Sequence, residues 1–318
     1  MDLFHNDIEQ SAILANNAYE ELHLGDSLQV VRMFQDANFP FILQLVRINE
    51  LSLGRIPWHW HNEFEVIYAL SHPLTVRTDR SAHTLYPGDA CFINTNVLHT
   101  VISENQDCTF LYFRFHQHLI FPKPGARVTN LYANTISHEP ILDNLYFDHT
   151  LPAHNNIIAA IKDLIRLYAK KETCYELKIS GTLQYFWAFL YECAQGKLST
   201  PHRAERNADS DRIKEAISFI SQNYATPLTL KDIADAIHVS RNECCRCFQR
   251  AVGYSPIEYL MYYRILESTK KIKNKDPDAQ SISVLAESCG FNNTSYFNKL
   301  FKRFTNMTPL QYKKRFCK

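Results

Sequence analysis

A twelve-residue stretch near the C-terminal end occurs twice, and this repeat constrains the fold more than any other feature. Residues 248–259 read FQRAVGYSPIEY, and residues 301–312, 53 positions later, read FKRFTNMTPLQY. Phe, Arg, Pro and Tyr recur at matching places, and each copy follows an alanine-containing helical pattern and a short turn. An internal repeat means that one structural unit is used twice. The sequence therefore predicts two helix-turn-helix units in tandem, typical of a protein that binds DNA at two places.

The charge of the chain is divided unevenly. Residues 206–318 carry 19 Lys and Arg against 11 Asp and Glu, and the remaining residues carry 15 against 22. This asymmetry indicates a C-terminal region that faces nucleic acid and an acidic N-terminal region. The sequence has no apolar run of about 18 residues, and residues 1–7 hold an acid but no basic segment. We therefore expect no contact with a membrane and no secretion.

The nine cysteines favour a reducing compartment. They are odd in number and scattered along the chain, which is typical of free thiols in the cytoplasm. Cys244, Cys245 and Cys247 lie close together but lack the CxxC spacing and the second ligand pair of a zinc site. We expect them to be small apolar side chains on a helix, and we expect no cofactor.

Residues before about 120 alternate between apolar and polar side chains, which is typical of β-strands. The alternation is clearest in four segments, separated by short turns, so a sandwich or barrel is expected. These segments are residues 41–48, 63–70, 74–78 and 109–115.

After about residue 150 the apolar period becomes helical, and two amphipathic helices are expected. The apolar stripe of the first is formed by Ile157, Ile161, Leu164, Ile165 and Tyr168. The stripe of the second is formed by Ile179, Leu183, Phe186, Trp187 and Leu190. Such faces need a partner, either the barrel or a second subunit. We predict that the second stripe forms part of a two-fold homodimer interface.

The expected fold class has two domains: an N-terminal all-β barrel with two following helices, and a C-terminal all-α tandem helix-turn-helix. The predicted boundaries are 1–150 for the barrel, 151–196 for a helical dimerisation element, 197–209 for a polar linker and 210–318 for the helical domain. In the helical domain Thr229 and Ser240 are expected N-caps. Cys244, Cys247 and Phe248 are expected to face its core.

Residues 210–318 resemble the tandem helix-turn-helix domain of AraC-type bacterial transcription regulators. The resemblance lies in the motifs Pro227-Leu228-Thr229-Leu230, Ile233-Ala234, Val239-Ser240, Arg246-Cys247-Phe248, residues 253–260 (GYSPIEYL), Arg264, Ala286, Gly290-Phe291, Ser295-Tyr296-Phe297, residues 301–304 (FKRF) and Thr308-Pro309. Asn306 stands where the second unit usually has Gly. Because Asn tolerates a positive φ, we expect the turn there to be kept.

The N-terminal part resembles the cupin-type effector domain that is often joined to this DNA-binding domain. Residues 57–65 read PWHWHNEFE, residues 86–94 read YPGDACFIN, and His99 follows at a short distance. His59, His61, Glu65 and His99 have the spacing of a cupin metal site, which would suit Fe, Mn or Zn. The resemblance instead implies a small-ligand pocket without a metal, lined also by Trp60 and Tyr68.

The outward faces of the two second helices are the expected DNA-reading surface. Arg246 can bind guanine through two hydrogen bonds, Asn242 can read adenine, and Lys299 lies 53 positions after Arg246. A phosphate contact is the alternative role for Arg246. The predicted DNA-facing residues are Arg241, Asn242, Cys245, Arg246, Gln249, Thr294, Ser295, Asn298, Lys299 and Lys302.

These features together predict a cytoplasmic transcription regulator that is not an enzyme. It would bind double-stranded promoter DNA and a small effector, such as a sugar or related metabolite, and would contact RNA polymerase if it is an activator. One alternative is a metal-dependent cupin enzyme that carries a DNA-binding domain. Another is an architectural DNA-binding protein that needs no ligand.

Overall fold

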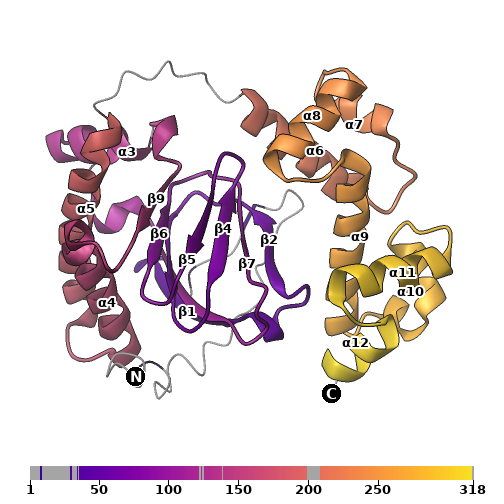
Figure 1. Cartoon of the computed structure of the whole chain (residues 1–318), viewed down its shortest axis with the longest axis horizontal. Helices are drawn as coiled ribbons and strands as arrows, with labels where there is room; N and C mark the ends of the chain where they lie inside the picture. Colours follow the sequence, from indigo (N-terminus) through magenta and orange to yellow (C-terminus); the bar gives the residue numbers. More distant parts are fainter. Residues whose placement is uncertain are drawn as a thin grey trace. The chain divides into compact units, whose positions relative to one another are not determined.

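The computed structural model describes residue 8, residues 29–30, 34, 36–121, 123, 125–137, 139–198 and 208–316. They fall into two compact units, and each is described by itself. Most described residues before residue 199 belong to the first unit, and residues 208–316 belong to the second. The predicted fold class is confirmed, because the first unit is a β domain followed by two helices and the second is helical (Figure 1).

Two antiparallel β-sheets form the β domain, and all their residues belong to the first unit except residues 55–58, which group with the second. The larger has the strand order β1 (Phe41–Arg47), β8 (Thr109–Phe115), β3 (Phe64–Ala69), β6 (Ala90–Ile93) and β9 (Asn144–Phe147). The smaller has the order β2 (Arg55–His59), β7 (His99–Ile102), β4 (Leu74–Thr78) and β5 (Ala82–Leu85). The four strand segments expected from the sequence are all present, as β1, β3, β4 and β8.

The larger sheet has one face toward the helices and one toward the other sheet. Successive side chains of a strand point to opposite faces. On β3 this places Phe64 and Tyr68 in the large hydrophobic core with the helices. Glu65 lies on the opposite face of β3, directly across from Arg114 on β8. The strand register therefore brings an acid and a base together between the sheets.

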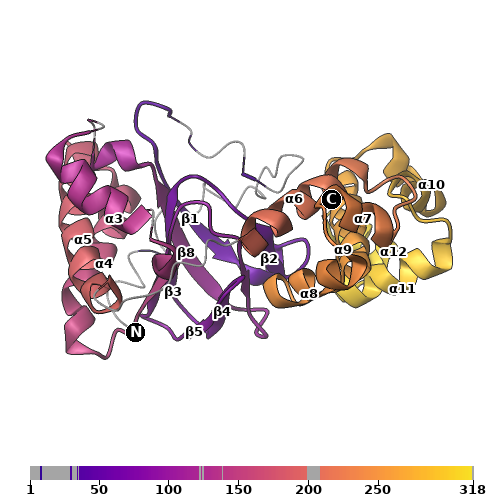
Figure 2. The ribbon, with the colours of Figure 1, turned by 90° about the horizontal axis from the view of Figure 1, so that it is seen from above.

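Helices α4 (Asn155–Lys170) and α5 (Tyr175–Leu198) cover the first of these faces (Figure 1). Lys171 ends α4 in the left-handed conformation, as the turn between two antiparallel helices needs. Shorter helical segments complete the unit, and α3 runs beside α5 (Figures 1 and 2). They are η1 (Ile48–Glu50), η2 (Gln117–Leu119), η3 (Thr129–Ala133), α3 (Asn134–Ser137), η4 (Pro140–Leu142) and η5 (Pro152–His154).

The apolar stripe of α5 is part of this core, so its predicted place in a dimer interface is wrong. All five of its residues are at most 2% exposed. Phe186 packs its ring against Phe113 and Phe115, and Trp187 lies 4.7 Å from the Phe64 ring. The exposed face of α5 instead carries Tyr185, which is 70% exposed. Burying large aromatic rings against the nearby sheet removes most of their apolar area from water.

The second unit consists of helices that follow the predicted order. They are α6 (Ala208–Asn223), α7 (Leu230–Ala236), α8 (Arg241–Ala251), α9 (Pro256–Lys273), η6 (Pro277–Gln280), α10 (Ile282–Ser288), α11 (Thr294–Thr305) and α12 (Pro309–Phe316). Thr229 and Ser255 cap α7 and α9 through capping boxes with Asp232 and Glu258. Ser240 caps α8, as expected.

The limits of the predicted linker, residues 197–209, differ from the structure. Helix α5 continues through Leu198, and α6 already begins at Ala208. Polar residues do not interrupt a helix when they lie on its exposed side. Residues 199–207 of the predicted linker lie outside the described residues.

Two turns of the second helix-turn-helix contain a residue with positive φ. Gly290 has a φ of 81°, and a Cβ atom there would lie 2.6 Å from the Tyr224 carbonyl oxygen. Asn306 ends α11 with a φ of 58°, so the expectation that Asn would keep this turn is confirmed.

Among the helices formed by described residues, none is long and apolar enough to span a membrane.

Candidate functional sites

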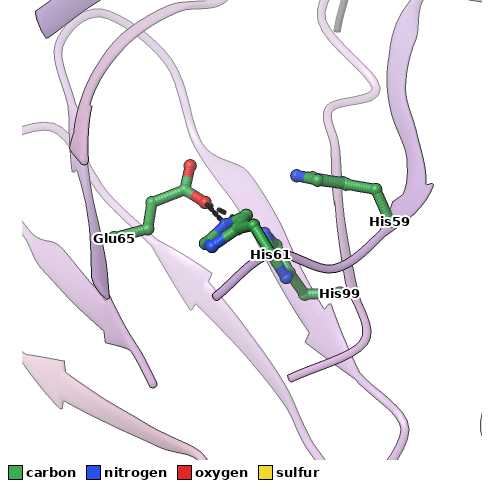
Figure 3. Close-up of side chains that lie close together, drawn as sticks. All are labelled: His59, His61, Glu65 and His99. Atoms are coloured by element: carbon green, nitrogen blue, oxygen red, sulfur yellow. Dashed lines mark hydrogen bonds and ion pairs between the residues drawn. The ribbon is translucent and has the colours of Figure 1, made fainter. Parts of the chain in front are cut away.

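The structure brings together the four residues predicted to form a polar cluster between the sheets. His59 ends β2, His61 follows it, Glu65 lies on β3 and His99 begins β7. Figure 3 shows that the carboxylate of Glu65 points at the rings of His61 and His99, while His59 lies to one side. Glu65 Oε2 is 2.7 Å from His61 Nε2 and 3.0 Å from His99 Nε2. All four side chains are buried, with at most 3% exposure.

Arg114 is a fifth member of this cluster, and the sequence analysis missed it. Its Nη2 lies 3.0 Å from His59 Nε2, and its Nε lies 3.2 Å from Glu65 Oε2. The side chain is only 2% exposed. A charged residue within the apolar strand Thr109–Phe115 was the available signal, because Arg is almost never fully buried without a partner. The pairing of β3 with β8 identifies that partner.

The charges in the cluster favour an ion pair beside the neutral rings of His59 and His61. Burial alone would raise the pKa of Glu65, but the Arg114 guanidinium and the hydrogen bonds to His61 and His99 hold that pKa well below its usual value. Burial and the nearby Arg114 lower the pKa of His61 to about 4. Burial and the neighbouring His99 and Arg114 also lower the pKa of His59 well below its usual value. Glu65 is therefore negative and His59 and His61 are neutral near pH 7.

This arrangement leaves one contact of His61 unsatisfied. Its Nδ1 lies 2.9 Å from the Glu63 carbonyl oxygen, and its Nε2 faces Glu65. His99 has the same environment, with Nδ1 2.8 Å from the Val97 carbonyl oxygen. A neutral imidazole donates through only one nitrogen, so in the His61 ring a lone pair faces an oxygen. A hydroxyl donor or a cation placed beside Glu65 would relieve this opposition.

A metal ion fits part of this cluster. His61, His99 and Glu65 could offer two ring nitrogens and one carboxylate oxygen, and the potential ligand atoms of the four predicted residues lie within 4.8 Å of one another. His59, however, is hydrogen-bonded to Arg114. The guanidinium also places a positive charge against the carboxylate that a metal would need. The buried charge of Glu65 is thus balanced without a metal.

We expect that removing metal ions will leave the first unit unchanged, because Arg114 already neutralises Glu65. Purified protein treated with EDTA should keep its melting temperature and contain no stoichiometric metal by elemental analysis. A zinc protein with a known structural site serves as the positive control for the chelator. Loss of one metal per chain together with a lower melting temperature would contradict this expectation.

Both predicted ligand-contacting aromatic residues, Trp60 and Tyr68, are buried, but Tyr68 lies away from the polar cluster. Trp60 is 7% exposed and lies between His59 and His61 in the sequence. Tyr68 belongs to the hydrophobic core with Phe64, on the face of β3 that is opposite to Glu65. Its predicted role beside the polar cluster is therefore wrong, because side chains three positions apart on a strand point to opposite faces.

The first candidate DNA-binding surface is the outer face of α8. Arg241, Asn242, Arg246 and Gln249 are exposed as predicted, while Cys245 is half-buried. Cys244, Cys247 and Phe248 face the core. The guanidinium of Arg246 pairs with Glu243 on the same helix. Glu243 also contacts Arg250, at 3.2 Å. Arg246 is 67% exposed, so this pair is solvated and easily exchanged for another partner.

The second candidate surface is the outer face of α11. Ser295, Asn298, Lys299 and Lys302 are exposed, while Thr294 is half-buried. Asn293 caps this helix by accepting from the backbone N–H of Tyr296 at 2.9 Å. The two faces thus repeat the same pattern at the same place in each helix-turn-helix.

Lys270 and Lys271, near the end of α9, are less available to contact DNA than a fully exposed run of lysines would be. Lys270 pairs with Glu267 at 2.6 Å, and Lys271 pairs with Asp278 at 2.8 Å. Both lysine side chains are less than a quarter exposed. Lys270 thus contacts an acidic residue of its own helix, whereas Lys271 joins α9 to Asp278 of η6.

Comparison with known proteins identifies both units. Residues 48–186 match the family described as AraC-like ligand binding domain, and residues 233–315 match the family described as helix-turn-helix domain. The uncharacterized HTH-type transcriptional regulator YdeC of Bacillus subtilis is 28% identical over 92% of this chain and 97% of that protein.

Other relatives align over shorter stretches. The lactose operon transcription activator of Staphylococcus xylosus is 24% identical over 49% of this chain and 56% of its own length. The melibiose operon regulatory protein of Escherichia coli is 28% identical over 32% of this chain and 33% of its own length. These relatives are regulators and not enzymes. With a ligand-binding domain and a helix-turn-helix domain in this order, the chain belongs to the AraC family of transcription regulators.

Proposed function

We propose that this regulator reads a specific promoter sequence through α8 and α11 and responds to a small hydroxylated effector in its first unit. The observation that supports sequence reading is the repeated exposed face of these two helices. Each presents polar and basic side chains outward from a short, N-capped helix. A helix of this kind enters the major groove in helix-turn-helix proteins.

The His61 lone pair that faces an oxygen supports the choice of effector. A hydroxyl group donates one hydrogen bond and accepts others, so it can face both a lone pair of His61 and the guanidinium of Arg114. A sugar or related metabolite carries several such groups. Two relatives are named for the lactose and melibiose operons, which agrees with this choice. Because the cluster is buried, binding requires the first unit to open.

The proposal includes a homodimer and, for an activator, contact with RNA polymerase. Dimers are the commonest oligomers of soluble proteins, and two copies would pair two DNA half-sites. The exposed face of α5, which carries Leu177 and Tyr185, is the candidate interface. Large apolar side chains that gather on one exposed face often mark protein contacts.

Arg246→Ala tests base reading. The preferred DNA site is first selected with the full-length protein from a random library, and affinities are then measured at fixed salt for this site and for random DNA. We expect a loss of about 1–3 kcal/mol on the selected site, with relaxed preference at one base pair. Arg315→Ala is the matched control, because Arg315 is exposed on α12 and should affect all DNA alike.

Two outcomes of this experiment would count against the proposal. If Arg246→Ala weakens random DNA and the selected site equally, Arg246 contacts phosphate and does not read a base. Lactose, melibiose and other sugars are also added to the protein–DNA complex. If none changes the DNA affinity or the melting temperature of the protein, the effector is not a sugar.

A further inference from the structure

The first unit contains a cavity that is separate from the polar cluster. It has a volume of about 580 Å³ and is lined by twelve residues, from the segment 120–132 and from α5. Volumes of about 300–1,000 Å³ are typical of sites for small molecules. None of the five members of the polar cluster is among these residues. The cavity is thus a second place in this unit where a small molecule can be held.

The floor of the cavity is aromatic and closely packed. Trp187 of α5 lines it, although the side chain as a whole is only 2% exposed. The indole ring packs against Phe64 at 4.7 Å and against Phe121 at 5.5 Å. Its Nε1–H donates to the Tyr132 carbonyl oxygen at 3.1 Å. Such a preformed surface loses little conformational entropy when a ligand binds.

One wall of the cavity is a π-helix, which is a rare conformation. The segment Thr129–Ala133 forms this π-helix, and Thr129 and Tyr132 line the cavity. π-Helical turns occur frequently at functional sites. Tyr132 meets the Tyr191 ring edge-on at 5.0 Å, which joins this wall to α5. The unusual backbone thus shapes the cavity.

The lining indicates which molecules fit. Ile120, Val128 and Ala188 are apolar, and Val128 is 55% exposed at the surface. An exposed apolar side chain beside a cavity favours an apolar occupant. The exposed polar residues of the lining are Lys123 and, on α5, Gln184 and Glu192. The Glu192 carboxylate accepts hydrogen bonds and cannot donate them.

We infer that this cavity binds a small, mostly apolar molecule that contains a ring and has one hydrogen-bond donor for Glu192. The aromatic floor receives the ring, and the donor reaches the edge of the cavity. The twelve lining residues are too few to form a protein interface by themselves, because a stable interface needs about 20–30 residues on each side. The site is distinct from that of the hydroxylated effector proposed above.

N-Phenyl-1-naphthylamine is a suitable probe, because it is apolar and aromatic and has a single N–H donor. It is titrated into the full-length protein, and its fluorescence is excited directly and by energy transfer from tryptophan. We expect saturable binding of one probe per chain. Ala188→Leu, which places a larger side chain in the cavity, should weaken this binding by roughly tenfold or more.

Ala159→Leu is the matched control, because Ala159 is exposed on α4 and is not among the lining residues. This variant should bind the probe within about twofold of the unchanged protein. Three outcomes would overturn the inference. They are the absence of saturable binding, an equal loss in Ala188→Leu and Ala159→Leu, and conversion of a dimer to monomers by Ala188→Leu with probe binding unchanged. The last would mean that the cavity receives a second copy of the chain.

Discussion

Replacing Arg114 with Met is expected to reduce the free energy of unfolding of the first unit by about 3–5 kcal/mol. The substitution keeps much of the side-chain volume but leaves the Glu65 carboxylate buried without its guanidinium. A buried charge that has lost its partner is strongly destabilising, whereas the loss of a solvated ion pair has little effect. Urea unfolding followed by tryptophan fluorescence measures the change, since Trp58, Trp60 and Trp187 all precede residue 208.

Arg47→Met is the matched control for this experiment. Arg47 lies at the end of β1, is 39% exposed and pairs with Glu50 at 3.7 Å, so we expect a loss below about 1 kcal/mol. The double variant Arg114→Met with Glu65→Gln should recover part of the loss, because it removes the unpaired charge. Equal losses for Arg47→Met and Arg114→Met would show that the buried pair does not stabilise the unit.

Phe186→Lys is expected to prevent the first unit from folding. Phe186 is completely buried among Phe92, Phe113 and Phe115, so an ammonium group there would have neither water nor an acid beside it. Tyr185→Lys is the matched control on the exposed face of α5, and it should fold normally. Circular dichroism and thermal unfolding distinguish the two variants.

Light scattering on the same pair of variants also tests the dimer. If the exposed face of α5 is the interface, Tyr185→Lys should be a folded monomer. A folded, monomeric Phe186→Lys would instead contradict the assignment of Phe186 to the core. It would restore the interface predicted for this stripe from the sequence.

The local features of the helical unit could be predicted because their causes lie within a few residues. An N-cap depends on one side chain and a backbone N–H two or three positions later, as at Thr229 and Ser240. The left-handed turn at Asn306 depends on the residue itself. The repeat then predicted the second unit from the first. The exposed faces of α8 and α11 followed from helical periodicity alone.

The polar cluster could be predicted only in part. The HxH spacing and strand alternation place His59, His61 and Glu65 near one another, since these residues are close in sequence. Arg114 is 49 residues from Glu65, and only the pairing of β3 with β8 places them opposite each other. The same alternation, applied to Tyr68, would have put it on the other face of the sheet.

The sequence by itself thus determined the two-domain class, the tandem helix-turn-helix and the family, because these depend on local periodicity, capping and a repeat. The tertiary structure decided which surface the stripe of α5 covers. An apolar stripe requires burial, but it does not specify whether a sheet or a second subunit provides it. Tertiary structure also decided that Arg114 balances Glu65, and that a cavity opens beside Trp187. Both depend on contacts between strands and helices that are distant in sequence, which no local pattern encodes.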